Sequence, residues 1–312
     1  MVYPTPIKIG IPHALSYHKY APLWKTFFRA LGCQLVISPE TNRQILDNGS
    51  RLAVDETCLA VKIYLGHIHH LLDRVDYLFI PRFVSINTGE KLCIKLLALG
   101  DIVRNIFETD RVLEYTVDHD LHQYEMVGLI KLGLKLCPNL PRVLNAYRQA
   151  VVAQKASSKQ KIQKQMRILQ KDDPSRIRIL IVAHAYVSND AMMGKTVVKQ
   201  LREQDVDIVY ADWIDDKQAR RLSTSISSDL YWTYHKELLG GIEAYKHQVD
   251  GILFLMAFPC GPDALVINLC QNQLTDIPTT VLTLDELQAD AGIKTRIESF
   301  VDILRFKKER IS

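Results

Sequence analysis

Residues 7–39, IKIGIPHALSYHKYAPLWKTFFRALGCQLVISP, carry the pattern of one strand–helix–strand unit. The apolar run Ile7–Pro12 is short and ends at a proline, as a buried strand commonly does. Apolar residues then recur at helical spacing over His13–Leu31, and Gly32 ends that helix. A second apolar run, Cys33–Ser38, follows at once. Two strands joined by a helix predict a right-handed βαβ unit in a parallel sheet.

The same alternation of strand and helix continues on both sides of a helical middle region. The remaining expected strands are Val75–Pro81, a short candidate at Arg111–Val117, Ile177–Ala185, Val206–Tyr210, Gly251–Ala257 and Thr280–Leu284. The predicted fold class is therefore α/β, with two Rossmann-like domains whose parallel sheets face a cleft, plus a helical connector. The expected domains are residues 1–115, the connector 116–173, and residues 174–312 with a C-terminal helix.

Composition and charge narrow the class of protein. The chain has 312 residues, 47% hydrophobic and 24% charged, which is ordinary globular usage at a length that favours two domains. The net charge of +4 comes from 39 basic against 35 acidic residues, an excess too small to indicate nucleic acid binding. The connector's last helix, from Gln154 to Lys171, is rich in Lys and Gln and is expected to be solvated.

The chain carries no pattern of a secreted or membrane protein. Its start, MVYPTPIKIGIP, lacks the apolar run of a signal peptide, and no segment approaches the roughly 20 apolar residues of a membrane helix. The six cysteines show no close pairing, which favours free thiols in a reducing compartment over structural disulfides. We expect a cytoplasmic protein.

Three cysteines indicate a metal cluster. Cys58 in DETCLAVK, Cys93 in EKLCIKLL and Cys260 in FPCGPDALV each follow a predicted strand or begin a predicted helix. The carboxyl ends of strands in open α/β sheets are where such folds place ligand sites, so the fold is expected to bring the three together. The alternative is that each is a small packed residue, because free cysteine is often buried. Cys260 is the most specific, since PCGPD forms a tight turn with free backbone amides.

The other cysteines, Cys33, Cys137 and Cys270, lie within strand or helix patterns and are expected to pack. Further polar residues near the strand ends are expected to line the cleft or to cap helices: His13, Tyr17, Lys62, Arg82, Asn87, Asp190 and Asp263.

At these residues the sequence resembles a known family, the acyl-CoA dehydratase activase-related proteins, which are relatives of the D component of 2-hydroxyacyl-CoA dehydratases. The matching blocks, in order from Ile7 to about Leu304, are IGIPHALSYHKYAPLWKTFFRALGCQLVISPETN, DETCLAVKIYLGHI, VDYLFIPR, FPCGPDALV and TLDELQADAGIKTRIESFVDIL. The chain departs from the family pattern at His13, where arginine is usual, and at Ala60 and Ile94, where prolines commonly follow the cysteines.

The resemblance implies an oxygen-sensitive 4Fe-4S cluster whose ligands are Cys58, Cys93 and Cys260. Three thiolates on a cubane leave one iron open to another ligand. It also implies a protein that accepts low-potential electrons from an ATP-dependent activator of actin-like fold, for a reductase or dehydratase-type reaction, as a homodimer or heterodimer. Whether the chain is itself catalytic stays open.

Three other interpretations compete with this one. The altered loops favour a metal-free two-lobed binding or scaffold protein that has lost the chemistry. GHIHH, with His67, His69 and His70, suggests a hydrolytic zinc site, but solvated histidines on a surface helix are the expected arrangement, since the spacing supplies only two ligands. MMGKT at Met192–Thr196 is similar to the end of a phosphate-binding loop and so suggests nucleotide binding, but it lacks the first glycine of that motif.

Overall fold

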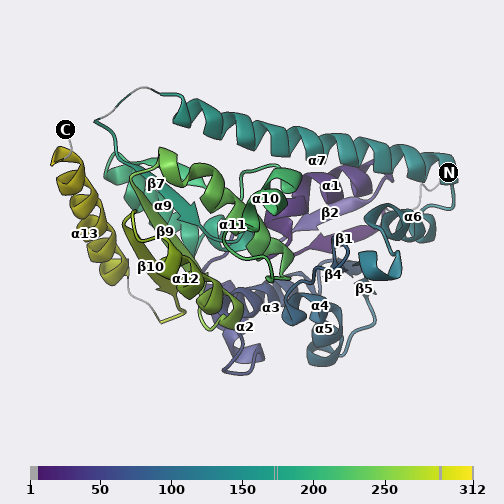
Figure 1. Cartoon of the computed structure of the whole chain (residues 1–312). Coiled ribbons are helices and arrows are strands. Elements are labelled where there is room, and N and C mark those ends of the chain that lie inside the picture. The colour runs from purple at the N-terminus through teal and green to yellow at the C-terminus, as the bar shows by residue number, and fades with distance from the viewer. Residues whose placement is uncertain (1–5, 172, 174, 288–289, 311–312) are drawn as a thin grey trace. The chain divides into compact units, whose positions relative to one another are not determined.

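The computed structural model describes residues 6–171, 173, 175–287 and 290–310, and the chain forms two compact units (Figure 1). Unit 1 contains the residues up to Asp55, Val61–Ser158 and Tyr231–Thr233. Unit 2 contains Glu56–Ala60, Lys159–Leu230 and the chain from Tyr234 onward. The main sheet of each unit is wholly parallel, which confirms the predicted α/β class.

The main sheet of unit 1 has the strand order β2-β1-β3-β5. Its strands are β1 (Lys8–Ile11), β2 (Gln34–Ile37), β3 (Tyr77–Phe79) and β5 (Val112–Leu113). The helices in or entering this unit are α1 (Tyr17–Ala30), α2 (Arg43–Leu52), α3 (Leu59–Leu71), α4 (Ile94–Leu97), α5 (Leu99–Phe107) and α6 (Glu125–Leu136). An aromatic core covers the sheet: the Phe28 and Phe79 rings lie 4.9 Å apart, and Trp24 Nε1 donates to the Tyr115 hydroxyl at 3.1 Å.

Unit 1 also contains a second, two-stranded sheet that the sequence did not predict. The candidate strand at Arg111–Val117 is divided between β5 and β6 (Thr116–Asp118). A further strand, β4 (Arg82–Ser85), follows β3 and pairs with β6 in parallel. Alternate residues of β4 are buried, among them Phe83, whose ring stacks on Tyr20 at 5.1 Å. The four residues of β4 are too short a run to stand out in the sequence, and packing on these aromatic rings stabilises them as a strand.

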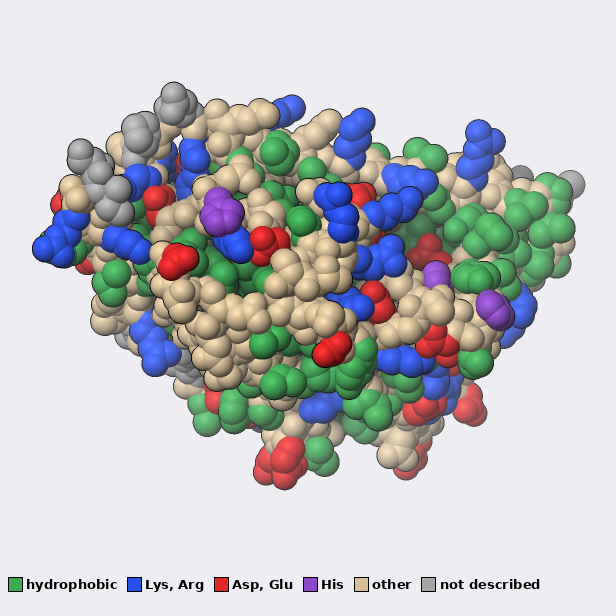
Figure 2. Space-filling view, viewed as in Figure 1, with side chains coloured by type: hydrophobic (Ala, Val, Ile, Leu, Met, Phe, Trp, Pro, Cys, Tyr) green, Lys and Arg blue, Asp and Glu red, His purple; other side chains and the backbone are tan. Residues whose placement is uncertain are grey.

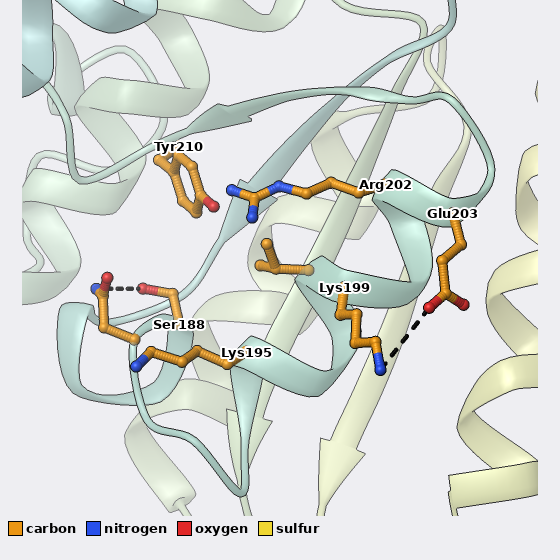
Figure 3. A pocket seen from close by; sticks show the side chains of 8 residues that line it. Ser188, Lys195, Lys199, Arg202, Glu203 and Tyr210 are labelled. Atoms are coloured by element: carbon orange, nitrogen blue, oxygen red, sulfur yellow. Dashed lines mark hydrogen bonds and ion pairs between the residues drawn. The ribbon is translucent and has the colours of Figure 1, made fainter. Parts of the chain in front are cut away.

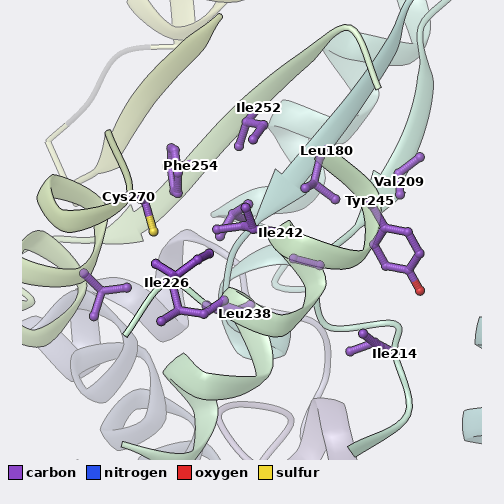
Figure 4. Packing of buried hydrophobic residues seen from close by; sticks show 14 of the residues in the cluster. Leu180, Val209, Ile214, Ile226, Leu238, Ile242, Tyr245, Ile252, Phe254 and Cys270 are labelled. Carbon is purple, nitrogen blue, oxygen red and sulfur yellow. The ribbon is translucent and has the colours of Figure 1, made fainter. Parts of the chain in front are cut away.

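The sheet of unit 2 has the order β10-β9-β7-β8, again all parallel. Its strands are β7 (Arg178–Val182), β8 (Asp207–Tyr210), β9 (Gly251–Ala257) and β10 (Thr279–Leu284). The helices are α8 (Ala185–Ser188), α9 (Gly194–Glu203), α10 (Asp216–Ser223), α11 (Thr233–Tyr245), α12 (Gly261–Gln273) and α13 (Asp290–Glu309). Every residue of β9 is buried. Figure 4 shows side chains of β7, β9 and α11, including Leu180, Phe254 and Ile242, packed in one apolar cluster.

Both sheets contain a topological switch point. The chain leaves β1 to form β2 on one side and later β3 on the other; it leaves β7 to form β8 on one side and β9 on the other. In open α/β sheets, ligands bind beyond the carboxyl ends of the strands at such a point. The edge of unit 2 where β7 and β9 end is therefore a place where functional side chains are expected.

The long helix α7 (Leu140–Leu169) belongs to unit 1 up to Ser158 and to unit 2 from Lys159. The prediction of a solvated helix from Gln154 onward was wrong at two glutamines. Gln165 is 0% exposed; its Oε1 accepts from the Tyr210 amide at 2.7 Å and its Nε2 donates to the Tyr210 carbonyl at 3.0 Å. Gln154 bonds to α1 in the same two-sided manner. A side-chain amide can satisfy two backbone groups at once, so the polar composition concealed two packed positions.

No helix in the described part of the chain is both apolar enough and long enough to cross a membrane. Basic and acidic side chains are interspersed over the face shown in Figure 2.

Two glycines allow α2 and α3 to approach closely, which makes one of them a test of the packing. A Cβ on Gly49 would lie 1.8 Å from the Lys62 carbonyl oxygen, and one on Gly66 would lie 1.9 Å from the Ile45 carbonyl oxygen. We expect Gly49→Ala to lower the free energy of unfolding by about 3 kcal/mol, because the two helices must separate. Urea denaturation measures it.

Gly292→Ala in α13 is the matched control, since nothing lies within 4 Å of its Cβ position. It should raise the free energy of unfolding by up to about 1 kcal/mol through helix propensity. Equal stability of Gly49→Ala and the wild type would contradict the close approach of α2 and α3.

Candidate functional site

The candidate site lies in unit 2, where β7 and β9 end. These strands are neighbours in register, with Val182 opposite Phe254. His184 follows β7 and directly precedes α8, and Cys260 follows β9 and directly precedes α12. Because both strands run in the same direction, the segments that follow them emerge at the same edge of the sheet.

Asp263 joins three elements at this edge. It lies in the first turn of α12, and its Oδ1 accepts hydrogen bonds from His184 Nε2 at 2.9 Å and from His235 Nε2, on α11, at 2.8 Å. The three residues are 5–6% exposed. Their potential ligand atoms all lie within 4.8 Å of one another. The arrangement is a buried carboxylate held between two imidazoles.

The electrostatics of this triad favour an ionised carboxylate. Burial alone would raise the pKa of Asp263, but the charge of His184 and the hydrogen bonds from both imidazoles hold it well below its usual range. Burial lowers the pKa of His235, against the opposing effect of the carboxylate. A carboxylate anion is the form in which Asp263 would bind a metal, and each imidazole would have to release its Nε2 proton to do so.

Two of the three predicted cysteine ligands, Cys58 and Cys260, lie in unit 2 near the triad. The residue after Cys58 begins α3, and its amide, that of Leu59, donates to the carbonyl of Phe258 at 2.8 Å, two residues before Cys260. Both cysteines are partly buried and free of disulfides. Burial, and then the charge of Asp263, raises the pKa of the Cys260 thiol; the charge of Cys58 acts in the same direction. The fold therefore brings these two sulfurs near each other.

Cys93, the third predicted ligand, lies in unit 1. It is the residue before α4, it is partly buried, and its carbonyl accepts from the amides of Leu96 and Leu97. Its segment is fixed by Lys91, whose amide donates to the carbonyl of Tyr231 at 2.9 Å. Cys93 thus begins a helix, as Cys58 and Cys260 do.

The remaining cysteines do not reach the candidate site. Cys270 is 0% exposed in the apolar cluster of unit 2 (Figure 4), where burial raises its pKa to about 12. Cys33 and Cys137 lie in unit 1, and burial raises the pKa of Cys33 to about 11, with Cys137 adding to the effect. The prediction that Cys270 packs is confirmed.

The histidines of GHIHH are placed differently from the prediction. His69 is exposed, but His67 is 0% exposed, and its Nε2 lies 3.0 Å from the Thr41 hydroxyl. Burial lowers the pKa of His67 to about 3, with His13, His18 and His70 adding to the shift. The prediction of a solvated histidine on a surface helix was wrong for His67, because the face of α3 that carries His67 packs toward the core of unit 1.

The MMGKT segment has a structural explanation in place of a phosphate loop. The Asp190 carboxylate accepts from the amides of Met192 and Met193, at 2.8 and 3.2 Å, just before α9. A Cβ on Gly194 would lie 2.5 Å from the Ser188 Cα, so close packing requires this glycine. The sequence prediction that Asp190 lies near a strand end or caps a helix is explained by these bonds.

An open cavity of about 460 Å³ lies beside α9 (Figure 3). Lys195, Lys199, Arg202 and Tyr210 are among its lining residues. In Figure 3 the Arg202 guanidinium points toward the Tyr210 hydroxyl, and Lys199 reaches Glu203 at 3.9 Å. Lys195, Lys199 and Arg202 are exposed cations on α9. The cavity that they line shares no residue with the small cavity lined by His184, His235 and Asp263.

Sequence reasoning identified part of this site. Asp263 was expected near the strand ends, and Cys58 and Cys260 were expected there as ligands. His184 lay within the expected strand Ile177–Ala185 and was not singled out; the strand ends earlier, at Val182. His235 was missed, because it lies inside a helix with no neighbouring motif, and only the packing of α11 brings it to Asp263.

The model of the family described as "CoA enzyme activase uncharacterised domain (DUF2229)" matches residues 8–214. No curated protein matches the chain. Two solved structures of the SBP FpvC from Pseudomonas aeruginosa, one in complex with Mn²⁺ and one with Ni²⁺, are similar to it at 12% and 11% identity. They cover 96% of this chain, and the match covers 99% and 98% of theirs, with TM-scores of 0.27 and 0.28. TM-scores this low support no inference about fold or ligand.

The buried His67 predicts a pH dependence of stability in the acid range. Its pKa in the folded protein, about 3, lies below the ordinary histidine value of 6.5, so below pH 6.5 the unfolded chain takes up a proton that the folded chain does not. This contribution to stability is present above pH 6.5 and is lost as the pH falls toward 3. Between pH 7 and pH 5 it should lower the free energy of unfolding by about 2 kcal/mol.

Urea denaturation at both pH values, on the wild type and on His67→Gln, checks this difference. The variant should lose about 2 kcal/mol less than the wild type on acidification. His69→Gln, at an exposed position on the same helix, is the control and should follow the wild type. Identical losses in wild type and His67→Gln would contradict a buried, neutral His67.

Proposed function

Because the chain belongs to the CoA enzyme activase uncharacterised domain family, we propose that it is an iron–sulfur protein whose 4Fe-4S cluster has Cys58, Cys93 and Cys260 as ligands. We propose further that it accepts low-potential electrons from an ATP-dependent activator of actin-like fold. Its role would be that of the resembled dehydratase component, in a reductase or dehydratase-type reaction. A cluster of this kind requires a reducing compartment, in agreement with free thiols and a cytoplasmic location.

The observation that supports this proposal most strongly is the proximity of Cys58 and Cys260 at the switch point of unit 2. The two cysteines are 202 positions apart in the numbering, so only the fold brings them together. Cys58 precedes α3 and Cys260 precedes α12. The amino-terminal end of a helix favours the negative charge that a ligating thiolate carries.

The donor set fits a metal–sulfur group. Two nearby thiolates repel each other, and the Asp263 carboxylate adds a third negative charge, which is why burial and charge together raise the pKa of Cys260. A bound metal reverses this balance, because a coordinating thiol is deprotonated outright. When bound, a cubane with three thiolate ligands supplies one-electron redox chemistry and one iron open to a further ligand.

The chain's own residues would have two tasks. The cysteines bind, and the His184–Asp263–His235 triad fixes the first turn of α12, which begins just after Cys260. While no metal ion is bound to the triad, the ionised Asp263 also holds a negative charge near this thiol. Net charge is one of the determinants of cluster potential, and a negative charge disfavours the addition of an electron. A cluster with a low reduction potential requires such an effect, because a low potential means that adding an electron is unfavourable.

Iron and acid-labile sulfide per chain, after strictly anaerobic purification and reconstitution, test the ligand set. We expect about four irons and four sulfides in the wild type. Cys58→Ala, Cys93→Ala and Cys260→Ala should each lose the cluster, because each removes one of three thiolate ligands. Cys33→Ala and Cys137→Ala, at partly buried thiols of unit 1, are the matched controls and should keep it.

Two outcomes would contradict the proposal. A wild-type chain without iron would make a metal-free binding or scaffold protein the better account. Full iron content in Cys93→Ala would remove this residue from the ligand set and leave only the two cysteines of unit 2.

A further inference from the structure

We propose that His184, His235 and Asp263 form a binding site for a single divalent transition-metal ion, chemically distinct from the cysteine ligands. The inference goes beyond the proposed cluster, because its ligand atoms are imidazole nitrogens and a carboxylate oxygen. All three residues belong to unit 2, so the site is complete within one compact part of the chain.

The spacing of the donor atoms fits one ion. His184 Nε2 and His235 Nε2 lie 2.9 and 2.8 Å from Asp263 Oδ1. Metal–nitrogen and metal–oxygen bonds in proteins are about 2.0–2.2 Å long, and two such bonds at a right angle place their donor atoms about 2.9 Å apart. The observed separations are those of the two hydrogen bonds, and a metal ion would take the place of the two Nε2 protons, which leave to solvent when it binds, with the three ligand atoms then at adjacent positions around it.

The charges in the site also favour a cation. Asp263 is 6% exposed; within the described residues its ion-pair partners are the two imidazoles, and its side chain also forms a hydrogen bond with the Cys260 thiol. A buried carboxylate is costly unless it is paired with a positive charge or coordinates a metal. Two histidines and one carboxylate are the protein ligands of several catalytic zinc sites and of non-haem iron(II) sites.

A small cavity adjoins the triad. It has a volume of about 20 Å³ and is lined by His184, His235 and Asp263 together with apolar side chains such as Leu238 and Phe254. A cavity needs about 10–15 Å³ to hold one water molecule. The space therefore admits a solvent ligand, which would occupy a remaining coordination position.

Binding of Co²⁺ to the full-length chain tests the site, because Co²⁺ is visible by its d–d absorption and accepts nitrogen and oxygen donors. Chelator-treated protein under anaerobic conditions should bind one Co²⁺ per chain through this site. Cys58→Ser/Cys260→Ser should keep this binding, since the triad contains no thiol. His69→Gln, an exposed histidine of unit 1, should also keep it.

The variant Asp263→Asn removes the charge but keeps an oxygen that accepts from the imidazoles. It should weaken Co²⁺ binding by about 100-fold or more, since losing an outer-shell partner alone costs 10–100-fold. His184→Gln and His235→Gln should do the same. Added Co²⁺ should raise the melting temperature of the wild type, because a ligand that binds only the folded state stabilises it, and should leave that of Asp263→Asn unchanged.

X-ray absorption at the cobalt edge of the wild type provides a measurement that does not depend on variants folding. It should show imidazole nitrogen and oxygen neighbours. The proposal would be overturned if the protein bound neither Co²⁺ nor Zn²⁺. It would also be overturned if the bound cobalt had sulfur neighbours and its binding were lost in Cys58→Ser/Cys260→Ser but retained in Asp263→Asn. Iron and sulfide content reports on the cluster separately, so either proposal can fail while the other stands.

Discussion

The pair of hydrogen bonds that Asp263 accepts from His184 and His235 is the interaction on which the candidate site of unit 2 depends. One carboxylate oxygen joins the segment that follows β7, the first turn of α11 and the first turn of α12. The turn that contains Cys260 is fixed at the same point. Without this carboxylate, two buried imidazoles would lose their partner, which typically costs about 1–3 kcal/mol for each unsatisfied group.

Burial around this carboxylate also gives the site its chemistry. The strands and helices that surround it are apolar, so negative charges here are poorly solvated and raise the pKa of the neighbouring Cys260 thiol. Such an environment favours cations, either as a metal ion bound by nitrogen and oxygen or as iron held by thiolates. The proposed ligand role of Cys58 and Cys260 and the proposed metal-ion site both rest on this concentration of negative charge at the end of one parallel sheet.

The architecture was largely predictable because buried parallel strands leave a simple signal. Runs such as Ile177–Ala185 are continuous and apolar, and their alternation with helices predicts parallel sheets. The placement of Cys58 near Cys260 followed from a rule about strand ends. β4 was missed because its four residues alternate in burial, and its pairing with β6 depends on rings contributed by distant helices.

The polar interior was much less predictable. His67 and Gln165 lie in segments whose composition predicts solvated helix, yet each is fully buried with a specific partner. His235 reaches Asp263 across 28 positions of sequence without any motif. Hydrogen bonds of this kind depend on the angle at which one helix packs, and hydrophobic periodicity contains no information about which polar group it will meet.

Mössbauer spectroscopy of the anaerobic chain reconstituted with ⁵⁷Fe tests the central claim, that cysteine thiolates hold a 4Fe-4S cluster, most directly. We expect the spectrum of a diamagnetic four-iron cubane in the oxidised protein, with one iron site distinct from the three that bind thiolates. A spectrum of mononuclear ferrous iron alone, or a chain that retains no iron, would contradict it.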